Sequence, residues 1–328
     1  MSHKRKRTIF ALSRQDGLKG TSASRQLKPR MKYYRKSPFC IMLKIKNLIV
    51  SAWVVGCSML FWQCDKIEEP FKEVTAQEVT VDTPYFAPQA AFLQKYLLED
   101  YTGHTCINCP AAHKVLHEMQ GQLGDTLVCM AVHSGSNAKP EEGLFSTDFR
   151  TNLGDYLATH FSVSGYPKGM INRLTFDGKR VLDRGDWKAR MASIPRLPAT
   201  LGLQIRDTTL PSRPDTAYIF VKTTFLQQTA RKLQLCVVLT EDSLIAPQKN
   251  GLQIDTHYVH NHVLRHSLSP ITGTLLNNGD SREAGAAEIR AYPLFRNPAW
   301  QWRRCHIVAM VIDTETEEIL QAESHPLK

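Results

Sequence analysis

The stretch YTGHTCINCPAAH, residues 101–113, decides the fold because it carries a Cys-x-x-Cys pair, Cys106 and Cys109. Residues 96–101 before it form an apolar and aromatic run of strand length, and residues 111–123 after it carry apolar side chains at helical spacing. Pro110 suits the first turn of a helix, where a missing amide hydrogen loses no partner. The pattern predicts that the dithiol opens a helix at a strand-to-helix junction.

A dithiol in this position favours redox chemistry. The unpaired amides and the dipole at the start of a helix stabilise a negatively charged sulfur. We therefore expect Cys106 to be the exposed, attacking thiolate and Cys109 to be the shielded, resolving thiol. A protonated His104 would add positive charge. Such chemistry needs no cofactor and no metal, and we expect neither.

Three other interpretations of the cysteine pair were weighed. Haem attachment requires His directly after the second cysteine, and Pro110 occupies that position. A zinc half-site with His104 or His113 would need a fourth ligand that the sequence does not identify. A static disulfide that closes the start of the helix remains a full alternative in an oxidising compartment.

The charge of the chain is concentrated at its N-terminus. The sequence has 41 basic and 31 acidic residues, a net charge of +10. Residues 1–64 contain fourteen of the basic residues and one of the acidic residues, which leaves 27 basic and 30 acidic residues from Asp65 onward. The folded part therefore lacks the positive charge of a polyanion-binding protein, and we expect no nucleic-acid partner.

Residues 42–64 have the pattern of an export signal. Two lysines precede an apolar stretch, residues 48–62, which is too short to span a bilayer comfortably but suits a signal-peptide core. A short membrane anchor is the alternative. Residues 1–41 are then a disordered basic extension or a mis-assigned start, and the proline-punctuated residues 65–89 form a tether.

Two cysteines compete as the site of lipidation after export. Cys57 follows a small residue, as in the general lipoprotein cleavage box, but cleavage there would leave an apolar start to the mature chain. Cleavage before Cys64 would leave the whole apolar core within the signal, and Cys64 precedes the charged stretch DKIEE. We therefore expect a mature chain that is anchored to the membrane by lipid at Cys64, since more than one acyl chain suffices without a spanning helix.

Residues 90–194 predict a β-α-β-α-β-β-α order, with a proline at the entry of the third strand. This order, with the dithiol before the first helix, resembles the thioredoxin fold. The resemblance implies that the Tyr166–Pro167 bond is cis and that Pro167 faces the dithiol and shapes the substrate groove. Cis bonds are nearly confined to such sites. The Ile107-Asn108 dipeptide differs from cytoplasmic thioredoxins, which leaves the reduction potential and partners open.

The segment PRLP, residues 195–198, marks a domain boundary. Residues 199–328 then contain short strand-like segments separated by turn residues, which predicts an all-β sandwich. These segments are residues 200–205, 216–225, 233–240, 258–264, 288–294, 305–312 and 319–322. The predicted fold class is an α/β thioredoxin-like domain followed by an all-β sandwich domain.

Histidines and cysteines outside the dithiol were also considered. His260 and His262 would share one face of a strand, which suits a metal pair, although a packed or solvated strand face is favoured. Cys129 is expected to be a buried apolar residue. Cys236 and Cys305 fall within predicted strands and would either bridge or remain buried free thiols.

Four features together resemble a known family. The export signal with its terminal cysteine and the segments LLEDYTGHTCINCP at 97–110, GYP at 165–167 and HNHVLR at 260–265 are similar to the Bacteroidetes outer-membrane lipoprotein family named for its 28-kilodalton member. The resemblance covers about residues 42–328 and implies a thioredoxin-like domain, a β-rich C-terminal domain, placement at the outer membrane and a suggested adhesin role.

Two functions follow from these patterns. The first is thiol-disulfide exchange with a protein disulfide or thiol substrate, through Cys106 and Cys109 with Pro167. The second is a surface adhesin that binds a host or surface ligand and carries a structural cysteine pair. Both place the protein, lipid-anchored, at the outer membrane, on the cell surface or on its periplasmic side.

Overall fold

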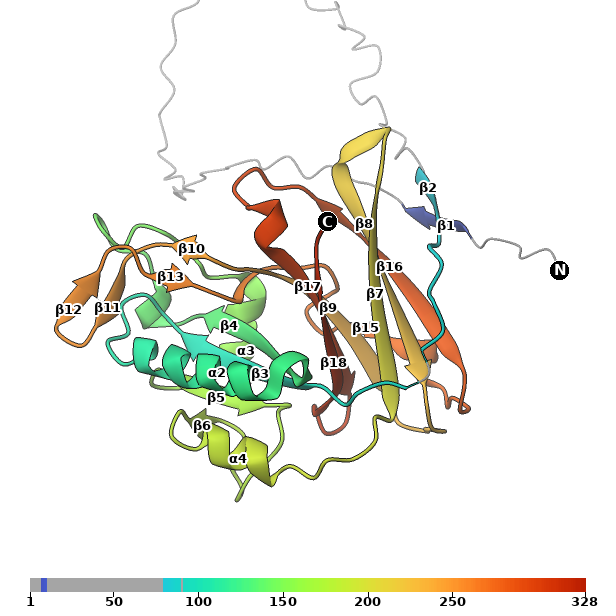
Figure 1. The fold of residues 1–328 in the computed structure, drawn as a ribbon, viewed down its shortest axis with the longest axis horizontal. Coiled ribbons are helices and arrows are strands. Elements are labelled where there is room, and N and C mark those ends of the chain that lie inside the picture. The colour runs from blue at the N-terminus through green and yellow to red at the C-terminus, as the bar shows by residue number, and fades with distance from the viewer. Residues whose placement is uncertain (1–6, 11–78, 90) are drawn as a thin grey trace, which may run out of the picture. The chain divides into compact units, whose positions relative to one another are not determined.

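Strand β3 (Tyr96–Thr102) is the centre of the first half of the molecule, because it leads directly into the dithiol and is buried along its whole length. It pairs in parallel with β4 (Leu127–His133) and antiparallel with β5 (Lys168–Ile171). Strand β6 (Leu182–Asp183) extends this arrangement beyond β5. Figure 1 shows these strands in a computed structural model that describes residues 7–10, 79–89 and 91–328.

Helices cover both faces of this part of the sheet. Helices α2 (Cys109–Leu123) and α4 (Trp187–Ser193) pack on one face, and α3 (Asn152–His160) packs on the other. Alternate residues of β3 serve the two faces, since successive side chains of a strand point in opposite directions. Leu98 lies with α2 and Leu97 lies with α3. The predicted β-α-β-α-β-β-α order is confirmed.

The same sheet continues into the second half of the chain. Strand β14 (Val263–Ser267) pairs in parallel with β4 and antiparallel with β9 (Leu233–Glu241). Strands β17 (Cys305–Asp313) and β18 (Ile319–Pro326) complete the order β18-β17-β9-β14-β4-β3-β5-β6, and β15 (Thr274–Leu275) pairs with β9. One mixed sheet therefore crosses the predicted boundary at 195–198.

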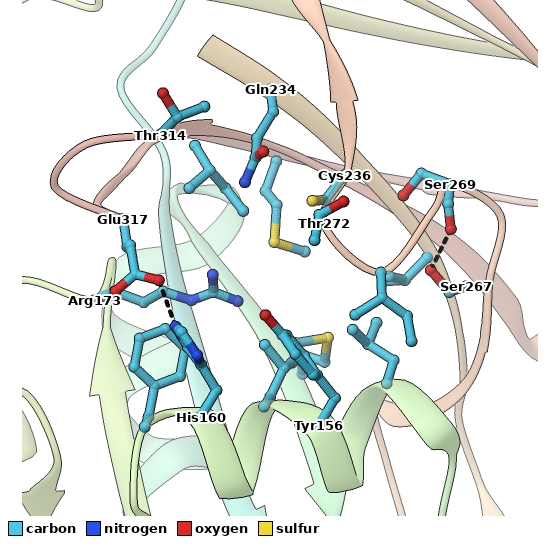
Figure 2. A pocket seen from close by; sticks show the side chains of 18 residues that line it. Tyr156, His160, Arg173, Gln234, Cys236, Ser267, Ser269, Thr272, Thr314 and Glu317 are labelled. Atoms are coloured by element: carbon cyan, nitrogen blue, oxygen red, sulfur yellow. Dashed lines mark hydrogen bonds and ion pairs between the residues drawn. The ribbon is translucent and has the colours of Figure 1, made fainter. Parts of the chain in front are cut away.

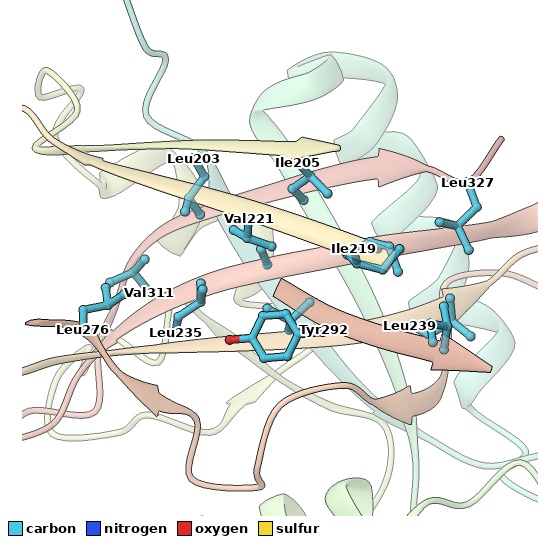
Figure 3. Packing of buried hydrophobic residues seen from close by; sticks show 14 of the residues in the cluster. Leu203, Ile205, Ile219, Val221, Leu235, Leu239, Leu276, Tyr292, Val311 and Leu327 are labelled. Carbon is cyan, nitrogen blue, oxygen red and sulfur yellow. The ribbon is translucent and has the colours of Figure 1, made fainter. Parts of the chain in front are cut away.

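A separate antiparallel sheet packs on the C-terminal half of the mixed sheet. It consists of β7 (Leu201–Leu210), β8 (Arg213–Phe225) and β16 (Ala287–Phe295), in the order β16-β8-β7. Figure 3 shows Ile205, Ile219 and Val221 of this sheet opposite Leu235 and Leu239 of β9. Aliphatic side chains from both sheets form this core, which we call the inter-sheet core.

Strand β9 joins the two halves because both of its faces are buried. Leu235, Val237 and Leu239 belong to the inter-sheet core, whereas Cys236 and Val238 pack in the cluster that contains α3. The α3 side of the first half therefore shares its apolar cluster with strands from beyond residue 198. That residues 90–194 and residues 199–328 fold as separable domains stays a prediction.

Several short elements complete the described chain. Strands β10 (Leu244–Ile245) and β13 (Val259–His260) pair with each other, as do β11 (Gln248–Asn250) and β12 (Gln253–Asp255). The remaining short strands are β1 (Arg7–Phe10) and β2 (Val79–Asp82). The 3-10 turns are η2 (Gly124–Thr126), η3 (Ser136–Ala138), η4 (Leu276–Gly279) and η5 (Trp302–Arg304).

Several predictions for the N-terminal part fall outside the described residues. They concern the export signal at 42–64, both candidate lipidation sites, Cys57 and Cys64, and all but four residues of the extension 1–41. The predicted tether 65–89 is described only from Val79 onward, where it contains β2 and the buried Phe86. Within the part of the chain that the structure describes, no helix has the length and apolar character needed to cross a membrane.

Candidate functional site

Cys106 and Cys109 form a disulfide, with their sulfur atoms 2.11 Å apart, between the end of β3 and the start of α2. Helix α2 begins at Cys109, and Pro110 occupies its first turn as predicted. Cys106 precedes the helix in a turn in which its own amide donates to the carbonyl of Gly103 (3.0 Å). The second cysteine, rather than the whole dithiol, therefore opens the helix.

The expectation that Cys106 is exposed is wrong for the oxidised protein. Cys106 is 4% exposed and Cys109 is fully buried. The segment that covers Cys106 comes from far along the chain: β11 and β12 form a hairpin that contacts the dithiol loop and the start of α2. We call residues 248–255 the cover hairpin. Between the two cysteines, Ile107 remains 50% exposed.

Backbone hydrogen bonds hold the cover hairpin against the dithiol loop. The amide of Lys249 donates to the carbonyl of His104 (2.9 Å), and the amide of Gly251 donates to the carbonyl of Ile107 (3.0 Å). The buried side chain of Gln248 donates to the carbonyl of Cys106 (3.0 Å). The cover hairpin therefore packs directly on the loop that carries the buried Cys106.

Pro167 lies where the predicted topology puts it, at the start of β5. The Tyr166–Pro167 bond is cis, which confirms the prediction. The β3–β5 register pairs Lys168 with Tyr101, so Pro167 lies at the end of the sheet from which the dithiol loop leaves. The hydroxyl of Tyr166 lies 3.0 Å from Oγ of Ser134, which ties this turn to the end of β4.

Asp100 is the residue of this region with the most unusual environment. It is fully buried in the middle of β3, and neither carboxylate oxygen has a hydrogen-bond partner among the described residues. Desolvation raises the pKa of Asp100 from 3.8 to about 8. The alternation of β3 turns Asp100 toward α2, on the side of Leu98. It lines a cavity of about 290 Å³ together with Pro110, the residue after Cys109.

His113 connects Asp100 to a residue of the second half. Nε2 of His113 lies 3.4 Å from Oδ2 of Asp100 and 3.0 Å from Oγ1 of Thr102. Nδ1 of His113 lies 2.7 Å from the hydroxyl of Tyr258. His113 follows Cys109 by one helical turn, so both side chains lie on the same side of α2. Desolvation, together with the neighbouring imidazoles of His260 and His262, lowers the pKa of His113 to about 3, which keeps the ring neutral.

Further imidazoles surround the same cavity. His133 and His260 are each 2% exposed, and their ring centroids are 5.6 Å apart. Both nitrogens of His133, and Nδ1 of His260, are without a hydrogen-bond partner in the described ranges. Desolvation lowers the pKa of His133 well below 6.5 and that of His260 to about 4. We call this space, with Asp100 and His113, the imidazole cavity.

Two expectations about histidines are corrected by this geometry. His104 is 1% exposed and stacks on Phe145, and burial lowers its pKa, so it does not supply positive charge at neutral pH. His260 and His262 do not share a strand face, because His262 adopts a φ of 57° between β13 and β14. Across the described ranges there is no group of three or more His, Cys, Asp or Glu side chains arranged to hold a metal.

The other cysteines of the described residues are free and buried: Cys129, Cys236 and Cys305. Cys129 has the predicted position inside a central strand. Cys236 and Cys305 lie on adjacent strands, but the register pairs Cys236 with Met310 and Cys305 with Glu241, so the two thiols do not meet. The bridge between them is therefore excluded, and the alternative of two buried thiols is confirmed.

A second cavity lies on the opposite face of the sheet, between α3 and the strands β9 and β17. Figure 2 shows Tyr156 and His160 of α3 on one side of it and Gln234 and Cys236 of β9 on the other. Arg173 lines this cavity, but its guanidinium is committed to a buried, two-point ion pair with Glu99 (2.8 and 2.9 Å). The cavity is small, about 150 Å³, and lies away from the α2 face that carries Asp100.

Sequence reasoning missed Asp100, His133, Tyr258 and Gln248. Asp100 left a detectable signal, since an acidic residue inside a buried strand must be paired or protonated. Its neighbour Glu99 has Arg173 as a partner, and Asp100 has no such cation. Tyr258 and Gln248 come from segments more than 130 residues after the dithiol, and no local pattern links them to it.

Comparisons with known proteins agree with this architecture. The family model described as "Outer membrane protein Omp28" matches residues 155–328. The structure of HBP35 of Porphyromonas gingivalis covers 73% of this chain and 77% of its own length, with 17% identity and a TM-score of 0.57.

A crystal structure of a domain of the outer membrane lipoprotein Omp28 from Porphyromonas gingivalis also matches. It is 19% identical, covers 40% of this chain and 89% of its own length, and has a TM-score of 0.28. No curated protein matches the sequence. Because the family model spans more than half of the chain, this protein belongs to the Omp28 family of outer-membrane proteins.

Proposed function

We propose that this lipoprotein catalyses thiol-disulfide exchange through Cys106 and Cys109 on a thioredoxin-like half. The observation that carries the proposal is the disulfide at the β3–α2 junction, together with the carboxyl of Asp100, which is buried on the α2 side of β3 without a hydrogen-bond partner among the described residues. A purely structural disulfide gains nothing from such a carboxyl, whereas a dithiol that turns over needs a group to accept a proton. The strand order β4-β3-β5-β6 and the cis bond before Pro167 support the thioredoxin-like assignment.

The exchange has two steps. The Cys106 thiolate attacks one sulfur of a substrate disulfide, forms a mixed disulfide and releases the other sulfur as a thiolate, which takes a proton from water. Cys109 then loses its thiol proton, and its sulfur attacks Cys106. The internal disulfide forms and the second substrate thiolate leaves, so that two electrons have passed from the dithiol to the substrate.

Asp100 is the proton acceptor that we assign to the second step. Its carboxyl lines the imidazole cavity beside Pro110, and the dithiol follows on the same side of β3 and α2. With a pKa of about 8, the carboxyl is partly ionised near neutral pH and can both take and return a proton. The resolving step is therefore expected to speed up as the pH rises toward 8.

A second candidate function is supported by a different observation. Cys106 is 4% exposed beneath the cover hairpin, as a permanently buried structural disulfide would be. In that case the protein is a binding lipoprotein or adhesin whose β-rich half engages a surface ligand. The two candidates differ in whether Cys106 reacts with a partner disulfide.

Trapping of a mixed disulfide separates the two candidates. Cys109→Ser should accumulate adducts with a peptide disulfide through Cys106, because the resolving thiol is absent. Cys106→Ser should accumulate none, and Cys129→Ala, a matched change at a buried thiol, should retain full exchange. Equal adduct levels in Cys109→Ser and in the Cys106→Ser, Cys109→Ser double variant would show that Cys106 does not react.

We further propose that the mature chain is anchored by lipid at Cys64 and displayed on the cell surface. The anchor follows from the apolar core at 48–62, and surface display follows from the charged stretch after Cys64. Mass spectrometry of the N-terminal peptide from native membranes tests the site. Acyl chains on Cys57 would place the lipid anchor at Cys57 instead of Cys64. An unmodified peptide that continues from upstream sequence through Cys64 would exclude lipidation at Cys64.

A further inference from the structure

The imidazole cavity contains more unpaired buried polar groups than a structural role explains. The carboxylate of Asp100, both nitrogens of His133 and Nδ1 of His260 are buried without hydrogen-bond partners within the described part of the chain. Each such group costs about 1–3 kcal/mol if it stays dry. The cavity, at about 290 Å³, exceeds the volume that one water needs, and its polar walls offer partners to several waters.

A chain of exchangeable groups leads from Asp100 along this cavity. Oδ2 of Asp100 is 3.4 Å from Nε2 of His113, and Nδ1 of His113 is 2.7 Å from the hydroxyl of Tyr258. Asp100 is fully buried, His113 is 21% exposed and Tyr258 is partly exposed, so the chain runs from the interior toward solvent. Nδ1 of His113 is hydrogen-bonded to the Tyr258 hydroxyl, and Nε2, which is hydrogen-bonded to Oγ1 of Thr102 (3.0 Å), also faces Asp100. A small approach of Asp100 to Nε2 would complete an arrangement in which the imidazole can pass a proton.

We propose that His113 and Tyr258 conduct to solvent the proton that Asp100 takes from Cys109 during mixed-disulfide resolution. This inference rests on the proposed exchange function and assigns the proton route of the same site. His113 and Tyr258 are positioning residues, because they act through Asp100 and do not touch the reacting sulfurs.

The transfer balances without any additional reagent. Asp100, once protonated, gives its proton to Nε2 of His113, while Nδ1–H of His113 gives a proton to the Tyr258 oxygen and the Tyr258 hydroxyl releases one to water. One proton leaves, and the imidazole changes tautomer. When a donor later reduces the disulfide, Cys109 regains a proton by the reverse passage, which restores the first tautomer.

Other charged and titratable groups face this route from every packed element. They are Lys114 and His117 of α2, Cys129 and His133 of β4, His104 of the dithiol loop, Asp255 of β12, His260 and His262 of the 258–262 segment, and Arg265 of β14. The imidazoles of His133 and His260 remain neutral because burial lowers their pKa values. Their neutral rings therefore place no positive charge beside the path of the proton. His113 is the imidazole that contacts Asp100.

Stopped-flow kinetics with a chromogenic aromatic disulfide tests the route on the full reduced chain in detergent. The first thiolate released reports attack by Cys106, and the second reports resolution by Cys109. The trace of Cys106→Ser is subtracted to remove the signal of other thiols. Tyr258→Phe and His113→Asn are compared with Tyr292→Phe, a change in β16 that removes a hydroxyl bonded to Thr274 of β15.

We expect Tyr258→Phe and His113→Asn to leave the first step unchanged and to slow the second step about 10-fold. This is less than the roughly 100-fold or greater effect of a group that itself exchanges a proton with the reacting atom, because both residues act through Asp100. Added imidazole buffer should restore the second step in both variants in proportion to its concentration, and should not change the wild type or Tyr292→Phe. A merely structural role would not produce this rescue.

Two results would overturn the inference while leaving the exchange function in place. One is a second step at the wild-type rate in both variants, and the other is a slower second step that imidazole does not restore. If the wild type releases no first thiolate, Cys106 does not attack disulfides, and the exchange function and the proton route are both rejected.

Discussion

The inter-sheet core and the imidazole cavity are both buried, but they are built from opposite chemistry. The inter-sheet core is lined by aliphatic side chains of β7, β8, β9 and β17. The imidazole cavity, on the α2 side of the same mixed sheet, is lined by a carboxyl, several imidazoles and Tyr258. The first arrangement stabilises the fold, whereas the second costs stability.

The free energies of burial in the two regions have similar size and opposite sign. Burial of a leucine or isoleucine contributes about 1.5–3 kcal/mol, and a buried polar group without a partner costs about 1–3 kcal/mol. In a dry cavity, Asp100 and His133 would therefore offset the contribution of roughly two core aliphatic residues. Such a region beside a disulfide is the feature on which the proposed exchange function rests. The comparison also predicts how each region responds to substitution.

The largest expected effect is the loss of an aliphatic side chain from the inter-sheet core. Ile219 is fully buried in β8, so Ile219→Ala should lower the free energy of unfolding by about 2–5 kcal/mol, through lost burial and the cavity left behind. Ile289→Ala is the matched control, because Ile289 is 41% exposed on β16 of the same sheet. Denaturant unfolding measures both, and equal losses would contradict the assignment of the core.

The second effect has the opposite sign and depends on pH. Asp100 has a pKa of about 8 in the folded protein and 3.8 as its ordinary value. Below about pH 4 the carboxyl is neutral in both states. As the pH rises toward 8, the unfolded chain alone releases the proton, so Asp100 lowers stability progressively over this window.

Asp100→Asn removes this dependence because the amide carries no charge. The variant should be more stable than the wild type by up to about 5 kcal/mol at pH 8 and close to it at pH 4. Asp125→Asn, at an exposed aspartate after α2, should show no such pH dependence. A stability difference that is equal at both pH values would mean that Asp100 is not buried and protonated as described.

The smallest effect concerns the cover hairpin. Gln248 donates to the carbonyls of Gly103 and Cys106, so Gln248→Ala should weaken the closed position by about 1 kcal/mol. Reduction of the Cys106–Cys109 disulfide by a small thiol should then be about 5-fold faster. Gln253→Ala, at an exposed position of the same hairpin, serves as the control. An unchanged rate in Gln248→Ala would show that the hairpin does not limit access.

The sequence was informative where the signal is local. The dithiol at a strand-to-helix junction and the β-α-β-α-β-β-α order follow from short periodic segments and their spacing. The cis bond before Pro167 is expected from the resemblance of this order to the thioredoxin fold. The C-terminal strands were found for the same reason, although the predicted strand at 258–264 is broken by the left-handed conformation of His262.

The features that local patterns do not encode are the long-range ones. The cover hairpin has strands of only three residues, too short for an alternation signal, and it meets the dithiol loop across more than 140 positions. The continuation of the sheet depends on β14 pairing with β4, where Val263 faces Ala131. Likewise, the sequence shows an acidic pair at Glu99 and Asp100 but not which one has Arg173 as its partner.

The reduction potential of the Cys106–Cys109 pair tests the central claim most directly. It can be measured by equilibrating the full chain with redox buffers and quantifying the dithiol by alkylation, with Cys106→Ser as the blank. A pair that exchanges with protein substrates is expected between about −120 and −270 mV, the range of thioredoxin-like exchange proteins. A potential well below about −300 mV, typical of disulfides that resist reduction, would contradict the account and favour the structural role.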